Sequence, residues 1–99
     1  MRVLLSPFVA GDLEEIGDYI AKDSPRHASR LLKMIGSRIH EIAIQPELYR
    51  LRPEIGPEAR LAVLGQYVIL FRIRANAVRI ERIVHGSRDL VQILERAEI

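Results

Sequence analysis

Apolar residues recur at two different spacings along this chain of 99 residues, which divides it into a helical part and a strand part. Over residues 7–21 and 25–44 they recur every three or four positions, as expected for helices with one buried side. Ser6-Pro7 and Ser24-Pro25 each predict a helix start, because serine is a good N-cap and proline fits the first helical position. Only residues 22–23 separate the helices, so we expect them to fold back as an antiparallel hairpin.

The strand part follows a loop at residues 45–57 that is rich in proline. The first half of the stretch 67–73 is continuously apolar, which predicts a central strand covered on both faces. Gly65 can supply the positive φ that a type II′ hairpin turn needs just before it. We expect a short strand at 2–5, three more at 60–64, 67–73 and 78–85, a turn at 74–77, and a short final helix capped by Ser87 or Asp89.

These elements predict one α+β domain spanning residues 1–99, in the order β-α-α-β-β-β-α, with an N-terminal strand, an antiparallel helical hairpin, a three-stranded antiparallel meander and a short C-terminal helix. The hairpin should cover one face of the meander. The other face would keep more apolar area than one short helix can cover, so we expect an exposed apolar patch that binds a partner. Its candidate members are Ala62, Leu64, Val68 and Leu70.

Alternation along the last strand predicts which side chains share a face. One face would carry Val78, Ile80 and Val84. Arg82 would fall on this apolar face, where it needs a partner or an edge. The opposite face would carry Arg79, Glu81, Ile83 and His85.

Charge adds a preference for acidic or phosphate-bearing partners. Arginine outnumbers lysine 13 to 2 in a chain of net charge +2 and pI about 9.4. Guanidinium groups suit carboxylates and phosphates, although a codon preference of the genome explains the same bias. The acidic residues of the first helix are expected to form a solvated face, and opposite charge on the second helix favours the hairpin. These residues are Asp12, Glu14, Glu15 and Asp18, against Arg26, Arg30, Lys33 and Arg38.

The residue types also exclude several kinds of site. The chain has no cysteine, which rules out disulfides and thiolate metal sites and fits a reducing cytoplasm. No stretch approaches the ~20 apolar residues of a membrane span. His27 and His40 have no third ligand at a recognisable metal spacing. We therefore expect a cytoplasmic protein without a cofactor, a metal or a membrane partner.

Two motifs in the strand part carry a family resemblance. Gly65-x-Tyr67 enters the apolar strand, and His85-Gly86-x-Arg88-Asp89 follows the last strand. Together with the helical hairpin, the segments PEIGPEARLAVLGQYVILFRI and VRIERIVHGSRDL resemble the ParE branch of the RelE/ParE toxin superfamily over nearly the whole chain. These proteins are the toxins of type II toxin–antitoxin modules, often called plasmid stabilisation proteins.

The resemblance implies a partner and a target. Such toxins are neutralised by a co-encoded ParD-like antitoxin whose C-terminal segment wraps the toxin, often in a hetero-oligomer, and they meet operator DNA only through the antitoxin. The ParE branch is taken to poison DNA gyrase and so block replication, as a binding protein without chemistry of its own. Two alternatives stay open: a metal-independent endoribonuclease of the RelE type that cuts messenger RNA on the ribosome, and a non-toxic protein that only binds its antitoxin and helps to repress their operon.

The residues separate these alternatives only in part. RNA cleavage without a metal needs a base, a proton donor and cations on the phosphate. Arg88 matches a catalytic arginine of the RelE branch, but the segment LVQILERAEI after Asp89 contains no tyrosine or histidine. The other nuclease candidates are His85, Arg60 and Tyr67. As candidates for binding an antitoxin or target we single out a stripe of sheet arginines and the apolar residues near it: Arg60, Leu64, Val68, Leu70, Arg72, Arg74, Arg79, Arg82, Arg88, Leu90 and Leu94.

Overall fold

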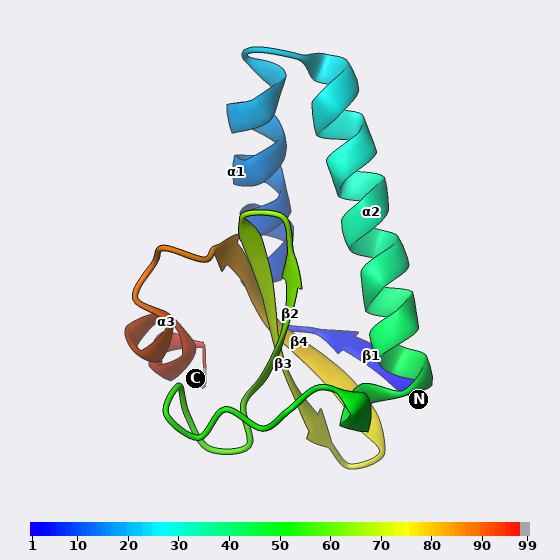
Figure 1. The fold of residues 1–99 in the computed structure, drawn as a ribbon, viewed down its shortest axis with the longest axis vertical. Coiled ribbons are helices and arrows are strands. Elements are labelled where there is room, and N and C mark those ends of the chain that lie inside the picture. Colours follow the sequence, from blue (N-terminus) through cyan, green and yellow to red (C-terminus); the bar gives the residue numbers. More distant parts are fainter. Residues whose placement is uncertain (98–99) are drawn as a thin grey trace.

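The computed structural model describes residues 1–97 and shows a helical hairpin that projects beyond a small twisted sheet (Figure 1). The order β-α-α-β-β-β-α predicted from the sequence is confirmed. No helix within residues 1–97 has the length and apolarity needed to span a membrane. The elements are β1 (Arg2–Leu5), α1 (Val9–Ala21), α2 (Pro25–Ile44), a 3₁₀ turn (Pro46–Leu48), β2 (Arg60–Leu64), β3 (Tyr67–Arg74), β4 (Ala77–His85) and α3 (Leu90–Arg96).

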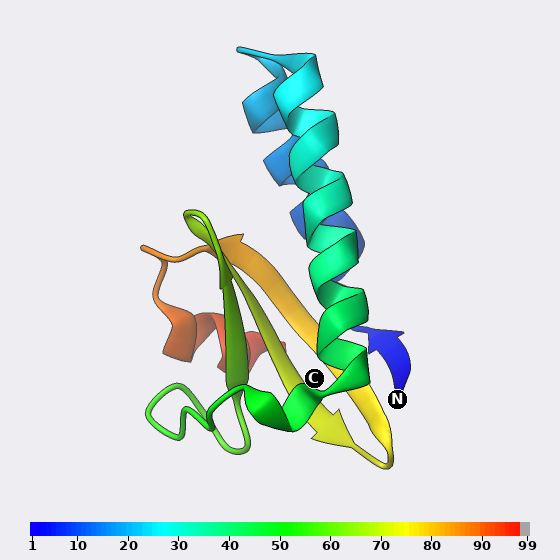
Figure 2. The ribbon, with the colours of Figure 1, turned by 45° about the vertical axis from the view of Figure 1, so that its right-hand side comes forward.

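The sheet has four strands in the order β1-β4-β3-β2. The predicted meander is present, because β2, β3 and β4 pair antiparallel. The N-terminal strand β1 adds to β4 in parallel. A parallel pair needs a long crossover, and the helical hairpin with the rest of the meander lies between these two strands in the sequence. Figure 2 shows α2 and α3 on opposite sides of the sheet.

Local signals set two of the three helix starts. Ser24 accepts a hydrogen bond from the His27 N–H and so caps α2 as predicted, and Asp89 caps α3 by accepting from the Gln92 N–H. The predicted start of α1 is wrong, since this helix begins at Val9 and not at Pro7. Ser6 is buried, and its hydroxyl donates to the Glu81 carbonyl and accepts from the Phe8 N–H. Ser6 therefore joins the strand–helix corner to β4, a long-range contact that the sequence did not reveal.

Both hairpin turns of the meander use left-handed backbone. Gly65 has φ +60° while Gln66 is not in the positive region, which agrees with the predicted type II′ turn. Ala75 and Asn76 have φ 49° and 64°, so the second turn has two positive-φ residues in succession, as type I′ requires.

A β-bulge in β4 overturns the predicted faces of that strand. Phe71 lies opposite Ile80, but Leu70 lies opposite Arg82, so Glu81 is an extra residue in β4. One inserted residue moves every later side chain to the other face. Ile83 therefore joins the cluster beneath the hairpin, whereas Val84 joins the cluster beneath α3.

The two faces of the sheet carry separate apolar clusters. The cluster beneath the hairpin includes Ala62 and Leu64, and the cluster beneath α3 includes Val68 and Leu70. All four are at most 8% exposed, so the predicted exposed patch is wrong. The helical hairpin covers Ala62 and Leu64, while the loop before β2 adds Ile55 and Ala59 to the cover that α3 provides over Val68 and Leu70.

Candidate functional site

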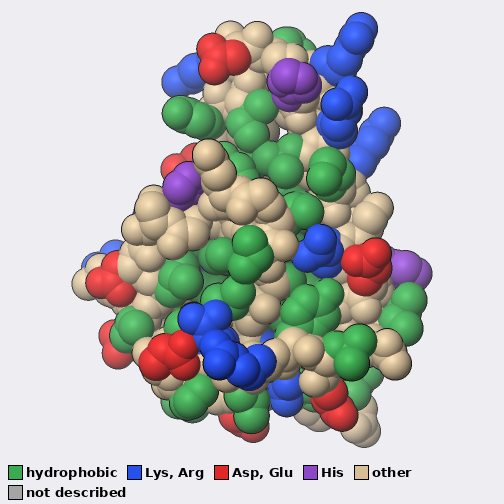
Figure 3. All heavy atoms as spheres, viewed as in Figure 1, with side chains coloured by type: hydrophobic (Ala, Val, Ile, Leu, Met, Phe, Trp, Pro, Cys, Tyr) green, Lys and Arg blue, Asp and Glu red, His purple; other side chains and the backbone are tan. Residues whose placement is uncertain are grey.

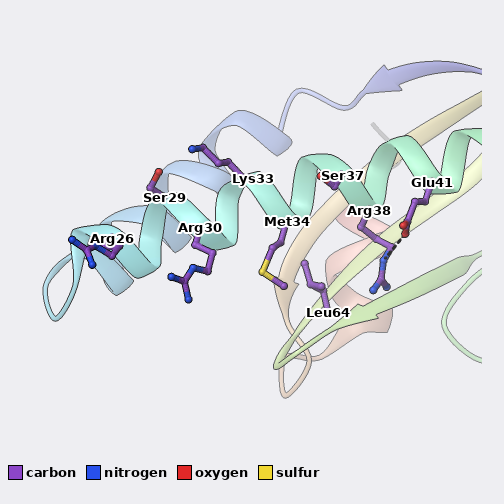
Figure 4. A pocket seen from close by; sticks show the side chains of 9 residues that line it. All are labelled: Arg26, Ser29, Arg30, Lys33, Met34, Ser37, Arg38, Glu41 and Leu64. Carbon is purple, nitrogen blue, oxygen red and sulfur yellow. Dashed lines mark ion pairs between the residues drawn. The ribbon is translucent and has the colours of Figure 1, made fainter.

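A groove of about 700 Å³ runs along α2 to the end of β2 (Figure 4). Its lining side chains on α2 recur every three to four positions, so they occupy one side of the helix. β2 contributes only Leu64 to this lining. The lining residues are Arg26, Ser29, Arg30, Lys33, Met34, Ser37, Arg38, Glu41 and Leu64.

The half of the groove nearest the hairpin tip is positively charged. Arg26, Arg30 and Lys33 are exposed, and none of them makes an ion pair with any residue in the range 1–97. Arg38 differs, because its Nη1 donates to the Val63 carbonyl over 2.8 Å and its Nε lies 3.2 Å from Glu41. Figure 3 shows Lys and Arg side chains projecting from the α2 side of the hairpin. The free cations are therefore available to an acidic partner, while Arg38 ties α2 to β2.

The groove also offers apolar area to a partner. Met34 is 46% exposed in the middle of the groove, and Leu64 of β2 lies next to it in Figure 4. Methionine adapts its shape to different apolar partners. A segment that carries both carboxylates and apolar side chains matches this surface better than a uniformly charged one.

The acidic residues of α1 play two different roles. Glu14, Glu15 and Asp18 are exposed, as predicted for a solvated face. Asp12 is buried, however, and its carboxylate accepts two hydrogen bonds from Arg82, at 2.9 and 2.7 Å. It also accepts the Ile83 N–H over 3.0 Å. The prediction that Asp12 is solvated is wrong, while the partner that Arg82 required is present.

Arg82 is held inside the protein by these contacts. The hydrogen bond with Asp12, together with the negative charge of Asp12, raises the pKa of the Arg82 guanidinium. The same guanidinium lies 5.1 Å from the centroid of the Phe8 ring. Arg82 thus joins α1 to β4 and is removed from the surface cations. No ion pair joins α1 to α2 within residues 1–97, so the opposite charges of the two helices do not pair as the sequence suggested.

A second hollow, of about 270 Å³, lies between α1 and the ends of β3 and β4. It brings together three of the four nuclease candidates, namely Tyr67, His85 and Arg88. Arg60 is not among them, because it begins β2 whereas Tyr67 pairs with the last residue of that strand. The Arg60 Nη1 instead donates to the Tyr49 carbonyl.

The groups in this hollow are arranged poorly for cutting a phosphodiester. His85 Nδ1 accepts from the Ser87 N–H over 3.1 Å, so the neutral ring carries its proton on Nε2. Burial raises the pKa of the Tyr67 phenol, which keeps it protonated and unable to act as a base near neutral pH. Asp12 and Glu15 line the same hollow. Among the lining residues Arg88 is the only arginine, and none is a lysine. Asp12 is already paired with Arg82, so a phosphate placed here would meet one further carboxylate, that of Glu15, against the single guanidinium of Arg88. The lining residues therefore offer no excess of positive charge.

The described residues 1–97 contain no group of three or more His, Cys, Asp or Glu side chains that could hold a metal ion.

Comparison with known proteins agrees with the motifs and the fold. A family model described as the ParE toxin of the type II toxin-antitoxin system, parDE, matches residues 3–90. The chain belongs to the ParE toxin family. Toxin ParE3 of Caulobacter vibrioides is 30% identical over 90 residues, which cover 90% of each protein. Putative toxin Y4kP of Sinorhizobium fredii is 34% identical over 84 residues, which cover 83% of this chain and 84% of the relative.

A solved structure described as a chromosomal ParDE TA system from P. aeruginosa has the same fold. It superimposes with a TM-score of 0.75 at 23% sequence identity, covering 86% of this chain and 95% of that one. At this identity the likeness concerns the fold, and the predicted RelE/ParE-like architecture is confirmed.

The sheet arginines of this ParE-family chain do not form the single stripe that we predicted. Arg60 and Arg82 are engaged elsewhere, as described above. Arg72, Arg74 and Arg79 do come together, at the opposite end of β4 from His85. Arg72 and Arg79 both contact the buried carboxylate of Glu81, at 3.5 and 2.7 Å. The sequence thus placed three of the five arginines in one cluster but missed the acid that holds two of them.

The apolar candidates for partner contact lie mostly inside the molecule. Leu64, Val68, Leu70 and Leu94 are buried, and Leu90 is half-buried. Leu64 lines the α2 groove, whereas a partner could reach Val68, Leu70 and Leu94 only if α3 or the loop before β2 moved. Arg74 and Arg88 are exposed and remain predictions for partner contact.

The α2 groove was missed as a site. The sequence showed that α2 is basic, but we assigned those charges to pairing with α1. The signal that identifies the groove is the spacing of Arg26, Arg30 and Lys33, four and three residues apart, beside the exposed Met34.

Proposed function

We propose that this chain is the toxin of a type II toxin–antitoxin pair, that a co-encoded ParD-like antitoxin neutralises it, and that it poisons DNA gyrase by binding. The observation that carries the proposal is the family match over residues 3–90, because that family is described as a toxin. The chain would act in the cytoplasm as one domain, and would form a hetero-oligomer with its antitoxin.

The α2 groove supports the antitoxin part of the proposal. Its unpaired cations suit an acidic segment, and the exposed side chain of Met34 suits an apolar residue on that segment. An antitoxin bound along the groove would cover the outer side of α2 as far as β2. Binding there would neutralise the toxin by denying this surface to its target.

Gyrase binding without chemistry is supported by the hollow near His85. Asp12 is paired with Arg82, and the charge of Glu15 offsets that of Arg88, so the lining residues do not provide the excess of cations that phosphodiester cleavage without a metal needs. Accordingly the chain would act by holding a partner protein in one state. Operator DNA would be contacted only through the antitoxin.

The test is induced expression of the chain, alone and together with the neighbouring antitoxin gene, followed by assays on gyrase. We expect growth arrest from the chain alone and recovery on co-expression. The purified chain should inhibit supercoiling and accumulate cleaved DNA. Unaffected gyrase in the presence of growth arrest would contradict the target, while unaffected growth would leave the non-toxic, antitoxin-binding alternative.

One observation keeps the RelE-like endoribonuclease as a second candidate. Tyr67, His85 and Arg88 do share one hollow, although its lining residues have no excess of cations. This candidate predicts codon-linked cuts in translated messages that His85→Ala and Arg88→Ala abolish. Arg50→Ala, which removes an exposed arginine in the loop before β2, is the matched control.

A further inference from the structure

A third hollow, of about 510 Å³, gathers four arginines from three strands on the sheet face opposite the helical hairpin. Arg2 comes from β1, Arg72 and Arg74 from β3, and Arg79 from β4. The end of α3 borders the hollow through Ala97. This cluster belongs neither to the α2 groove nor to the hollow with His85.

Strand register explains why these side chains converge. Across the three strands Arg2, Ala77 and Arg74 form one row, and Leu4, Arg79 and Arg72 form the next row on the same face. Neighbouring strands are about 4.8 Å apart, so the Cα atoms of Arg2 and Arg74 are separated by roughly twice that distance, with Ala77 between them. Ala77 itself is fully buried, and both long arginine side chains line the hollow.

One buried acid contacts two of these four arginines. Arg72 and Arg79 face each other directly across β3 and β4, where like charges repel. Glu81 lies between them and is 2% exposed. This pairing makes Arg72 and Arg79 structural parts of the sheet.

The other two arginines keep their charge at the surface. Arg2 is exposed and makes no ion pair with the part of the chain that the structure describes. Arg74 lies 3.7 Å from Glu58, but both side chains are exposed, at 49% and 67%, and such a pair contributes little. Among residues 1–97 that line it, the hollow therefore has an excess of positive charge, which Arg2 and Arg74 carry.

We propose that this hollow binds a phosphate group between Arg2 and Arg74. A phosphate has several oxygen acceptors and up to two negative charges, so two guanidinium groups can donate to it from opposite sides. A carboxylate has only one charge and two oxygens, so it gains less than a phosphate does from a second guanidinium. The phosphate can belong to a free or nucleotide phosphate or to a nucleic-acid backbone, which share this chemistry. The proposal does not depend on gyrase being the target.

The test is a titration of the purified full chain followed by the backbone amide resonances of Arg2, Ala77 and Arg79. The probes are inorganic phosphate, adenosine monophosphate, a short single-stranded oligonucleotide and acetate, all at constant ionic strength. We expect saturable shifts with a phosphate-bearing probe and much weaker ones with acetate. Tighter binding of the oligonucleotide would assign the site to a nucleic-acid backbone, whereas tighter binding of a small phosphate would assign it to free or nucleotide phosphate.

Variants separate this site from general attraction to a basic protein. Arg2→Gln and Arg74→Gln remove exposed groups, so the thermal unfolding should stay close to that of the wild type. Each should weaken phosphate binding about tenfold, the size expected for losing a hydrogen bond to a charged group. Arg50→Gln, an exposed arginine outside the hollow, should bind as the wild type does. The proposal is overturned if no probe gives saturable shifts, if acetate binds equally well, or if all three variants behave alike.

Discussion

At the scale of single residues, side chains of the same type have very different surroundings. Asp12 and Glu14 lie two positions apart on α1, yet the first is buried in a bidentate pair and the second is exposed. Arg74 and Arg72 differ in the same way, since one is exposed and the other is 2% exposed beside Glu81. Charge type alone therefore does not tell which residues meet a partner and which hold the fold together.

The Asp12–Arg82 pair gives the first prediction. Asp12→Ala leaves the Arg82 guanidinium, whose side chain is 16% exposed, without its carboxylate and also deprives the Ile83 N–H of its acceptor. We expect the free energy of unfolding to fall by about 3 kcal/mol, as for other buried pairs that lose one partner. Urea unfolding followed by circular dichroism measures it.

Glu14→Ala on the same helix is the control for Asp12→Ala and should change the free energy of unfolding by less than about 0.5 kcal/mol. The double variant Asp12→Leu/Arg82→Met should regain part of the loss, because it removes both charges together. Equal effects of Asp12→Ala and Glu14→Ala would show that the pair does not stabilise the fold.

Tyr67 gives a prediction about pH. Burial, and to a lesser extent the nearby Tyr19, raises the pKa of its phenol in the folded chain. The folded state then holds this proton more tightly than the unfolded state. The stabilising contribution of Tyr67 to the free energy of unfolding is therefore fully present below the unfolded pKa of about 10 and is lost as pH rises through the folded pKa. A spectrophotometric titration should show a late tyrosine step that Tyr67→Phe removes. Persistence of that step in Tyr67→Phe would assign it to another residue.

At the scale of elements, short-range chemistry determined most boundaries. Ser24, Asp89 and Gly65 act as the sequence predicted, as caps and in a turn. Each acts within a few residues of its own position. The exception is Ser6, whose hydroxyl bonds to the carbonyl of Glu81 across the fold, and there the predicted helix start failed.

Replacing two glycines by alanine should change the free energy of unfolding in opposite directions, because one lies in a turn and the other in a helix. Gly65 has φ +60°, where alanine is disfavoured, so Gly65→Ala should lower the free energy of unfolding by about 1 kcal/mol. Gly36 lies in the middle of α2, and a Cβ there meets nothing within 4 Å, so Gly36→Ala should raise it by about 0.5–1 kcal/mol. Denaturant unfolding of both variants provides the measurement, and equal signs would contradict the turn geometry or the helix assignment.

At the scale of the whole molecule, charge is separated between surfaces. The tip half of the α2 groove carries unpaired cations, the exposed side of α1 carries carboxylates, and the hollow beside β1 carries a third, basic site. Apolar residues that the sequence suggested for partner binding are instead distributed between the two cores. We therefore propose that this molecule recognises its partners mainly through charged surfaces with small apolar centres.

This separation predicts that binding of the proposed antitoxin depends on salt concentration. The triple variant Arg26→Gln/Arg30→Gln/Lys33→Gln should slow association about tenfold at low ionic strength and flatten its salt dependence, because rim charges act mainly on the encounter rate. Surface plasmon resonance at several salt concentrations measures this. Arg50→Gln/Arg96→Gln, which removes exposed arginines outside the groove, should behave as the wild type. A triple variant with unchanged association would show that the antitoxin binds elsewhere.

The sequence by itself determined the order of elements, two helix caps, both hairpin turns, and a set of arginines of which three share one site. Those features depend on spacing and on residues only a few positions apart, which the chain displays directly. The tertiary structure alone decided the bulge at Glu81, the burial of Asp12 against Arg82, the loop that covers Val68 and Leu70, and the presence of Arg2 and Arg74 in one hollow. Each of these depends on how segments distant in the sequence align, and a shift of one residue in one strand is enough to change which face a side chain occupies.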